Sequence, residues 1–255
     1  MGPELAIDAR QLMKTYRGRP TIQALRGLDL QVPTGKIVGL VGPNGAGKTS
    51  FFNLLSGIRH PTRGRIFFGA QDITDLAPHE RAKVGLARTF QTSSVFNNLA
   101  CLENVRISAQ AAYGKSMDLT RNAYRYTGVV AKASECLEKV GLNLRAQQLA
   151  GSLSHGDKRR LEIALVLASN SEIVLLDEPM AGMSVENVPE LVEIIRSRKS
   201  EHGKTVLIVE HHLEVVLGLA DRVAVLNYGE LLICDTPQNV INNSTVQSAY
   251  IGNAL

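Results

Sequence analysis

The segment from 42 to 50, GPNGAGKTS, combines three glycines with a lysine and two hydroxyl side chains. Glycine accepts the positive φ angles that let successive backbone N–H groups turn toward an anion. Gly42, four further residues and then Gly47-Lys48-Thr49 match the phosphate-binding loop, in which the lysine reaches the β- and γ-phosphates and the threonine hydroxyl binds Mg²⁺. The spacing therefore predicts that this segment holds a nucleotide together with Mg²⁺.

Two adjacent carboxylates end a short apolar segment, IVLLDEP, at residues 173–179. Four consecutive apolar residues predict a buried strand, whose end would deliver Asp177 to the shell of a Mg²⁺ ion. Glu178 follows directly and would orient and deprotonate an attacking water molecule. A solvated acidic turn would explain this segment if it stood alone, but a phosphate-binding loop in the same chain favours hydrolysis of the nucleotide.

The elements expected around the loop at 42–50 are a strand and a helix. Residues 36–42, KIVGLVG, form a short apolar run typical of a strand that is buried on both faces. After the loop, apolar side chains recur at helical spacing, at Phe51, Phe52, Leu54, Leu55 and Ile58. Gly57 and the HPTRG turn end this predicted helix. A loop between a buried strand and a helix N-terminus suits phosphate binding.

The rest of the chain shows two patterns. Residues 92–153 lack β-branched strand runs and have helical spacing, which indicates a helical insertion. Beyond it, strand and helix signals alternate, at 173–178, 185–199, 204–210, 222–227 and 230–235. Such alternation predicts an α/β fold with a parallel sheet and helices on its faces. Thr236 and Pro237 are a good N-cap and first-turn pair for a last short helix.

The composition limits the class of protein. The 255 residues are 44% hydrophobic, enough for a sizeable core, and 28 basic against 24 acidic residues give a formal charge of +4. This mild basic excess suits phosphates or an anionic membrane surface but is too weak to indicate nucleic acid. The apolar runs are far shorter than the roughly 20 residues of a membrane span. Three distant cysteines favour neither a disulfide framework nor a zinc site, so a soluble protein of a reducing cytoplasm is expected.

A third segment, LSHGDKRRLEIA at 153–164, predicts the start of a helix. Ser154 is a suitable N-cap for a helix that begins near Gly156, and Asp157 stands in the capping-box position. With the loop at 42–50 and the carboxylates at 177–178, the order and spacing of these segments resemble the ATPase subunits of ABC transporters over nearly the whole chain. LSHGD stands where the signature of that family reads Leu-Ser-Gly-Gly-Gln.

The resemblance implies a fold and a division of the chain. The expected fold is α/β, a P-loop NTPase of the ABC type with a mixed sheet core, an N-terminal antiparallel β-subdomain and a helical insertion subdomain. A single ABC ATPase domain would span residues 1–255. Within it, 1–91 and 154–255 would form the nucleotide-binding α/β core and 92–153 the helical subdomain.

The resemblance also implies how two chains share the nucleotide. Two subunits would pair head to tail, so that Ser154, Gly156 and their helix N-terminus cover the γ-phosphate of ATP held by the partner's loop. Tyr16 would stack on adenine, His211 would contact the γ-phosphate, and Gln91 would link Mg²⁺ and water to the helical insertion. Taken singly, such a tyrosine, histidine or glutamine is more often core or polar surface, and only the ordered set favours these roles.

ATP and Mg²⁺ are therefore the expected cofactors. The residues expected to bind ATP are Tyr16, Gly42, Pro43, Asn44, Gly45, Ala46, Gly47, Lys48, Thr49, Ser50, Ser154 and Gly156. The expected Mg²⁺ ligands are Thr49, Gln91 and Asp177. The expected catalytic residues are Glu178, His211 and Gln91.

The sequence departs from the family pattern at several positions. His155 replaces the third signature residue, glycine, and Asp157 replaces the last, glutamine. A titratable side chain beside the γ-phosphate would make turnover depend on pH, a hypothesis that an unchanged pH–rate profile in His155→Gly would remove. Ser184 stands where many members carry an aspartate that couples the two sites. Ala100 stands where Ser or Thr would pair with Glu103, so this helix start looks weakly capped.

Several short sequence segments are similar to those of the ATPase subunits of branched-chain amino acid importers. They are RTFQ, VFNNL, LENV, LSHGDKRRLEIA, DEPMAGM, VEH and AYIG. Such an importer implies two integral membrane permease subunits, a second ATPase subunit that is identical or a sibling, and indirectly a periplasmic or extracellular substrate-binding protein. The chain would be a peripheral subunit at the cytoplasmic face of the membrane, and no nucleic acid is expected. Related importers of urea and other small solutes share many of these segments, so they do not determine the transported substrate.

Other classes of protein explain fewer features. Soluble ABC ATPases of DNA repair or translation carry a very long coiled-coil insertion or two ATPase units in one chain, and the sequence shows neither. The ATPase subunit of an exporter or of a lipid transporter stays an alternative. The importer-like sequence segments between Gln91 and the signature argue against it. A small nucleotide kinase would share only the loop at 42–50 and would need neither LSHGD nor His211.

Overall fold

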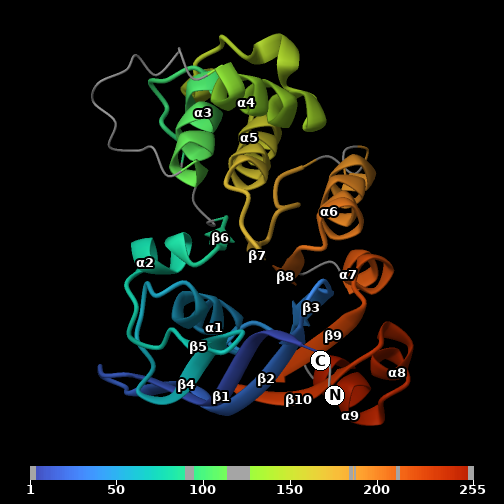
Figure 1. Cartoon of the computed structure of the whole chain (residues 1–255). Helices are drawn as coiled ribbons and strands as arrows, with labels where there is room; N and C mark the ends of the chain where they lie inside the picture. The colour runs from blue at the N-terminus through green and yellow to red at the C-terminus, as the bar shows by residue number, and fades with distance from the viewer. Residues whose placement is uncertain are drawn as a thin grey trace.

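A computed structural model of the chain describes residues 4–89, 95–113, 127–183, 186, 188–210 and 213–251, without the side chains of 198–202 and 249–251. Within this part of the chain, the strands form two sheets, and helices lie between and around them (Figure 1). None of the helices described combines the length and the apolar composition that a bilayer crossing requires.

The larger sheet forms the α/β core. Its strand order is β10-β9-β3-β8-β7-β6, and all neighbours are parallel except β10, which pairs antiparallel with β9. The strands are β3 (Ile37–Val41), β6 (Leu86–Arg88), β7 (Ile173–Asp177), β8 (Thr205–Val209), β9 (Arg222–Asn227) and β10 (Glu230–Asp235). Every residue of β3, β7 and β8 is buried, as their apolar runs predict. The expected parallel sheet is confirmed, with one antiparallel strand at its edge.

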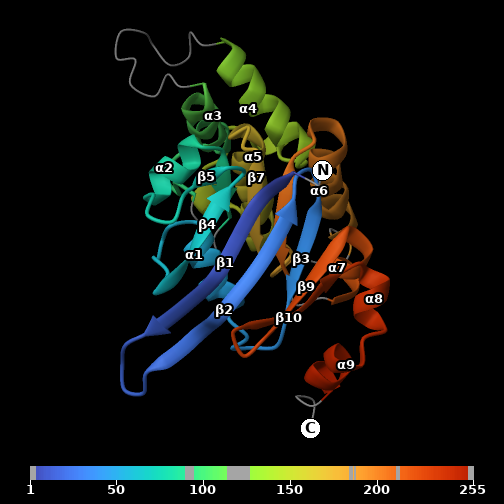
Figure 2. The ribbon, with the colours of Figure 1, turned by 60° about the horizontal axis from the view of Figure 1, so that its bottom comes forward.

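The smaller sheet is antiparallel and comes from the N-terminal part of the chain. Its strand order is β2-β1-β4-β5, and the strands are β1 (Leu5–Tyr16), β2 (Ile22–Pro33), β4 (Arg63–Phe68) and β5 (Gln71–Asp72). Ile7 lies opposite Val32 on one side and Phe68 on the other, so apolar side chains share one face of the sheet. Figure 2 shows β1 and β2 extending as a long hairpin. This sheet confirms the antiparallel unit that the resemblance implies.

Helix α1 (Lys48–Leu55) packs between the two sheets. Its buried apolar residues share one core cluster with the inner face of the small sheet and with one face of β3, including Leu12, Ile66, Val38 and Leu40. The other face of β3 contributes Ile37 and Val41 to a second cluster. Helix α1 begins three residues before the first apolar position of the sequence pattern and ends two residues before Gly57, which has a φ of 76°.

A buried arginine closes the carboxyl end of α1. Arg81 lies on the short helix α2 (Pro78–Lys83), which the sequence pattern does not predict, and is fully buried. Its guanidinium donates hydrogen bonds of 2.5–2.9 Å to the carbonyl oxygens of Leu54, Leu55, Thr74 and Leu76. Burial lowers the pKa of Arg81 to about 10. The side chain thus satisfies carbonyl groups that a helix end otherwise leaves without partners.

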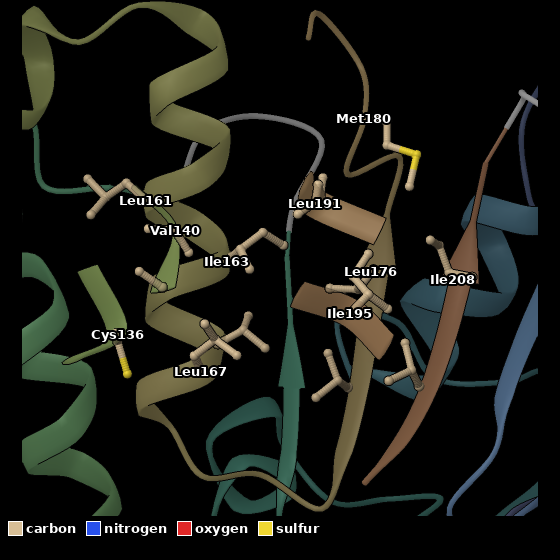
Figure 3. Packing of buried hydrophobic residues seen from close by; sticks show 14 of the residues in the cluster. Cys136, Val140, Leu161, Ile163, Leu167, Leu176, Met180, Leu191, Ile195 and Ile208 are labelled. Atoms are coloured by element: carbon tan, nitrogen blue, oxygen red, sulfur yellow. The ribbon is translucent and has the colours of Figure 1, made fainter. Parts of the chain in front are cut away.

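Helices α3 (Cys101–Ala112), α4 (Thr127–Lys139) and α5 (His155–Ala168) pack on one another at the top of Figure 1. Two short 3₁₀ helices, η2 (Asn143–Arg145) and η3 (Ala150–Ser152), lead from α4 to α5. Figure 3 shows apolar side chains that join these helices to the sheet, among them Cys136, Leu161, Leu167 and Leu176. Residues 92–94 and 114–126 of the expected insertion lie outside the described residues.

The start of α3 has backbone partners instead of a side-chain cap. Ala100 makes no capping hydrogen bond, as expected. The N–H groups of Cys101 and Leu102 donate to the carbonyl oxygens of Gln148 and Ala146, each at 2.9 Å. The segment before α5 therefore satisfies donors that a serine or threonine cap would otherwise serve.

The remaining helices follow β7 in the chain. They are α6 (Val188–His202), α7 (Leu213–Leu219), α8 (Pro237–Ile241) and α9 (Ser244–Ile251). The expected start of α6 at residue 185 lies outside the described residues. Thr236 caps α8, since its hydroxyl oxygen accepts from the N–H of Asn239 at 3.4 Å, and Pro237 is the first helical residue. This cap is confirmed.

Candidate nucleotide-binding site

The loop at 42–47 joins β3 to the N-terminus of α1, as the spacing predicts. Gly47 has a φ of 103°, and a Cβ atom added there would lie 2.6 Å from the carbonyl oxygen of Ala24. Only glycine fits this position without strain. Among the described residues, no side chain caps the N-terminus of α1. An uncapped helix N-terminus behind a glycine loop suits an anion.

The loop also lines a cavity of about 520 Å³. Val41 to Ala46 form one side, and Glu210, Leu213, Asn227 and Tyr228 complete the lining. The side-chain oxygen of Asn227 is buried and has no hydrogen-bond partner within the described residues. The space beside the loop is therefore open and contains an unsatisfied polar group.

Lys48 is the one charged residue of the loop at 42–50, and 7% of its surface is exposed. Its ammonium donates to the carbonyl oxygens of Gly42 at 2.6 Å and Pro43 at 3.1 Å. Burial lowers the pKa of Lys48, while the charges of Glu178 and Asp177 oppose that shift. The fold thus brings the lysine and the two carboxylates of the sequence pattern into one electrostatic environment.

The residues around the start of α1 differ in exposure. Thr49 is exposed and Ser50 is partly buried. Tyr16, the last residue of β1, donates from its hydroxyl to the Ser50 hydroxyl at 3.4 Å, and the ammonium of Lys14 lies 5.3 Å from the centroid of the Tyr16 ring. The tyrosine is therefore next to the helix that follows the loop, whereas its stacking on adenine stays a prediction.

Asp177 is fully buried at the end of β7. One carboxylate oxygen, Oδ2, accepts from Arg88 at 2.9 Å, and the backbone N–H donates to the Thr89 hydroxyl at 3.0 Å. The other oxygen, Oδ1, is buried and lacks a hydrogen-bond partner among the described residues. Burial raises the pKa of Asp177, and the Arg88 charge partly offsets that effect. An unsatisfied buried carboxylate oxygen is what a bound cation would complete.

Arg88 ties this carboxylate to α1. Besides Asp177, its guanidinium donates to the side chains of Asn53 at 2.8 Å and Ser56 at 2.7 Å. Its side chain is 6% exposed, and burial lowers its pKa while Asp177 raises it. A planar guanidinium can hold three partners in fixed directions, so Arg88 fixes the position of β7 relative to the helix after the loop.

Glu178 has an unusual backbone. Its φ is 49°, in the left-handed region that residues other than glycine rarely adopt. Its N–H donates to the carbonyl oxygen of Val209 at 2.9 Å, and its own carbonyl oxygen accepts from Arg159 at 2.7 Å and from the N–H of Ala181 at 3.1 Å. Strain of this kind is held only where neighbouring groups fix it, and it is common at functional sites.

The signature segment caps α5 as predicted, although the helix begins at His155, one residue earlier. The Ser154 hydroxyl accepts from the N–H of Asp157 at 3.2 Å and donates to its carboxylate at 2.8 Å. Arg145 binds the same carboxylate, so Asp157 serves the cap in a different way from the expected capping box. Ser154 and His155 are exposed, and a Cβ atom on Gly156 would meet open space.

Topology brings most of these residues to one edge. Strands β3, β8 and β7 are neighbours and parallel, so the loop, Glu210 and Asp177 all lie at carboxyl ends of strands, at the same edge of the sheet. Ligands of open α/β sheets bind at this edge. Ser154 and Gly156 lie instead at the start of α5, and Gln91, His211 and Ser184 lie outside the described residues.

Sequence reasoning missed three buried charged residues of the site, Arg88, Arg159 and Glu210. Glu210 is 3% exposed and accepts from the N–H of Met180 at 2.8 Å. A signal for Arg159 was present, because Arg159 and Glu162 are three residues apart on the face of α5 that also carries Ile163 and Val166. No comparable pattern marks Arg88 or Glu210.

Comparison with known proteins supports the same interpretation. A family model described as "ABC transporter" matches residues 25–181. The high-affinity branched-chain amino acid transport ATP-binding protein LivG of Escherichia coli (strain K12) is 36% identical over 99% of both chains. BraF of Pseudomonas aeruginosa, which has the same description, is 35% identical over 91% of this chain and 92% of its own. The lipopolysaccharide export system ATP-binding protein LptB of Acidithiobacillus ferridurans is 35% identical over 96% of each chain.

Solved structures of ATP-binding cassettes have the same fold. A nucleotide-free cassette from an ABC transporter superposes with a TM-score of 0.82 at 27% identity, over 97% of this chain and 99% of that chain. A dimeric cassette in a post-hydrolysis state with ADP and Pi gives a TM-score of 0.80 at 26% identity, over 91% of this chain and 98% of that chain. The chain belongs to the ABC transporter family, as one of its ATP-binding ATPase subunits.

Proposed function

We propose that the chain is the ATP-hydrolysing subunit of an importer for branched-chain amino acids. The observation that carries the proposal is the meeting of Lys48, Asp177 and Glu178 at one edge of the sheet, in a chain similar over its full length to LivG. The lysine would bind the β- and γ-phosphates of ATP, and the backbone N–H groups of the loop would surround them. Glu178 would act as the base for the attacking water.

The donor set also fits Mg²⁺. Asp177 presents a buried carboxylate oxygen without a hydrogen-bond partner in the described part of the chain, and Thr49 presents an exposed hydroxyl. Carboxylate and hydroxyl oxygens are hard ligands of the kind that Mg²⁺ prefers. When bound, Mg²⁺ neutralises charge on the β- and γ-phosphates. Gln91 as a third ligand and His211 at the γ-phosphate are predictions outside the described residues.

A second ATPase subunit is part of the proposal, as the same chain or a sibling. Ser154 and His155 are exposed and Gly156 is partly exposed at the N-terminus of a 14-residue helix, and no described residue fills the space next to Gly156. A helix N-terminus attracts anions through its N–H groups and its dipole. Ser154 and Gly156 would bind the γ-phosphate of ATP held by the partner, so ATP would join the two subunits.

Permease subunits are the proposed membrane partners, which makes the chain a peripheral subunit at the cytoplasmic face. A cavity of about 550 Å³ lies between α2, β6, α3 and α5, with Pro78, Ala82, Leu86, Ser108, Ala111 and Leu165 in its lining. A short helix of one permease subunit would insert into it, and the second ATPase subunit would receive the other permease in the same way. Closure of the ATPase dimer would thereby move the membrane subunits. A periplasmic or extracellular binding protein would deliver the substrate to those subunits.

We also propose the division of the chain into a core of residues 1–91 and 154–255 and a helical subdomain of residues 92–153. Helix α5, at the start of the second core segment, packs on α3 and α4. It would therefore connect the two parts of this division when the two subunits close on ATP.

A second candidate is supported by the similarity to LptB, whose name describes lipopolysaccharide export. In that case the ATPase chemistry would be the same and the permease subunits would differ. Uptake of labelled leucine separates the candidates. We expect a strain that lacks this gene to regain uptake with the native chain but not with Lys48→Ala. Equal uptake in all strains, in a host without another leucine route, would contradict leucine import and make urea the next substrate to test.

The ATPase role has its own test in Glu178→Gln. The variant should bind ATP but hydrolyse it about 10²- to 10⁴-fold more slowly, because the water loses its base. It should also form an ATP-dependent dimer, visible by light scattering, since ATP stays between the subunits. Glu138→Gln, at an exposed position of α4, is the matched control and should hydrolyse ATP at the native rate. Native hydrolysis by Glu178→Gln would overturn the assigned base.

A further inference from the structure

Arg159 is a buried cation in the first turns of α5, five residues after Ser154. Its guanidinium is divided between two kinds of partner. Nη1 donates to the carboxylate of Glu162 on the same helix, with an N–O distance of 2.5 Å. Nη2 donates to the backbone carbonyl oxygens of Asp177 and Glu178, each at 2.7 Å. The side chain thus connects the signature helix to the two acidic residues at the end of β7.

The contact with Glu178 holds a strained residue. The backbone N–H of Glu178 is fixed by Val209 of β8, and its carbonyl oxygen receives Arg159 from α5 together with the N–H of Ala181. The left-handed φ of 49° at Glu178 therefore depends on groups from two separate elements. Backbone rotation at Glu178 would change the direction of its carboxylate, because the Cα–Cβ bond turns with the backbone.

Charge balance alone does not account for the use of arginine here. Glu162 is 3% exposed and already balances the positive charge of Arg159. A lysine would provide the same charge, but its single ammonium lacks the planar fork that lets one nitrogen contact Glu162 while the other contacts the two carbonyl oxygens. The geometry of the guanidinium, and not only its charge, links α5 to Glu178.

We propose that Arg159 is a positioning residue for ATP hydrolysis. It holds the backbone of Glu178 in the conformation that aims the carboxylate at the water, and it couples that conformation to the helix that begins at Ser154. A shift of α5 in response to the partner's nucleotide would thereby reach Glu178 of the same chain. The inference rests on the proposed role of Glu178 as the base, and it adds a residue that acts through Glu178 without touching ATP.

The test begins with Arg159→Lys in the full chain. We expect kcat for ATP hydrolysis to fall roughly 10- to 100-fold, because a small misplacement of a catalytic group has an effect of that order. KM for ATP should change less than about threefold, since Lys48 and the loop are untouched. Arg106→Lys is the matched control, because Arg106 is also buried and pairs with the partly buried Glu103, three residues before it on α3. That variant should keep the native kcat.

A double-mutant cycle with Glu178→Gln separates positioning from a purely structural role. If Arg159 acts through Glu178, Arg159→Lys should slow hydrolysis in the native background and have little effect in Glu178→Gln. Single-turnover rates divided by the amount of bound ATP describe only the folded molecules. They can therefore be compared even where a variant folds incompletely. An equal slowing in both backgrounds, a change in KM alone, or an equal loss in Arg106→Lys would overturn the proposal. Native hydrolysis by Glu178→Gln alone would show that the assignment of the base had failed.

Discussion

The loop at 42–50 and the N-terminus of α5 both present backbone N–H groups, but they differ in how they are enclosed. Lys48 in the loop is 7% exposed and is bonded to the carbonyl oxygens of the loop itself. At the start of α5, Ser154 and His155 are exposed, and Gly156 faces open space. One site is assembled by its own chain, whereas the other faces outward.

The difference indicates which parts of the site one chain supplies. The loop is held by the turn between β9 and β10, since Gly229 donates its N–H to the carbonyl oxygen of Ala46 at 3.0 Å, and Arg88 ties the helix that follows the loop to Asp177. The described hydrogen bonds of the Ser154 side chain both go to Asp157. A side chain whose contacts serve only its own helix is free to meet another molecule, which is consistent with the proposed second subunit.

Substituting one glycine at each site tests this comparison with the largest expected effects. Gly47→Ala should lower the free energy of unfolding by about 2–4 kcal/mol, because it combines a positive φ with a Cβ atom 2.6 Å from the Ala24 carbonyl oxygen. Gly156→Ala should leave that free energy unchanged or raise it by up to about 1 kcal/mol, since alanine favours helix. Urea unfolding measures both.

ATPase activity then distinguishes the two glycines in a second way. Gly156→Ala should reduce hydrolysis at least about tenfold by blocking the close approach of the partner's γ-phosphate, although its fold is intact. Binding of ATP to the single chain should be unaffected. Full activity in Gly156→Ala, or a stable Gly47→Ala protein, would remove the contrast between an enclosed and an open site.

Two helix caps test the same comparison with smaller expected effects on stability. Ser154 caps α5 and Thr236 caps α8, each by accepting a hydrogen bond from an N–H group three residues later. Replacement of either by alanine should cost about 1 kcal/mol of unfolding free energy. Only Ser154→Ala should also reduce hydrolysis, by roughly tenfold or more, because only this hydroxyl would meet the partner's ATP. Thr236→Ala serves as the control, and equal ATPase rates in the two variants would contradict a role for Ser154 beyond its helix.

Periodicity predicted the parts of the fold that depend on local sequence. The apolar runs of β3, β7 and β8 and the caps at Ser154 and Thr236 are signals within a few residues, and all were confirmed. Helix α2 and strand β6 are only six and three residues long, too short for a periodic pattern. Tertiary contacts, such as those of Arg81 with the end of α1, hold them instead.

The same division holds for the site. The loop and the carboxylates at 177–178 are contiguous motifs, so their residues could be identified from the sequence. The hydrogen bond from Arg88 to Asp177 joins residues 89 positions apart, and no spacing rule predicts such a pair. The left-handed backbone of Glu178 likewise depends on β8 and α5, which approach only in the folded chain. Contacts that support the motifs therefore required the structure.

The smallest expected effect concerns the pH dependence contributed by Asp177. Burial raises its pKa above the usual 3.8, with Arg88 opposing the shift, so the folded chain holds this proton more tightly than the unfolded chain. As pH rises from 3.8 through the raised pKa, the unfolded chain releases the proton first. The contribution of Asp177 to the free energy of unfolding must therefore fall across that window.

In the Asp177→Asn variant the side chain at this position cannot ionise, so the fall in the free energy of unfolding that Asp177 contributes should be absent. The free energy of unfolding of the native chain minus that of the variant should thus fall between pH 4 and pH 7. Urea titrations without Mg²⁺ measure this difference. Asp235→Asn is the control, because hydrogen bonds from Asn239 and Thr236 lower the pKa of Asp235 and place its window below 3.8. Its difference from the native chain should stay flat over the same range. A flat profile for Asp177→Asn as well would mean that the Arg88 guanidinium fully compensates the burial of the carboxylate, and the enclosed site would then carry no electrostatic cost that a cation could relieve.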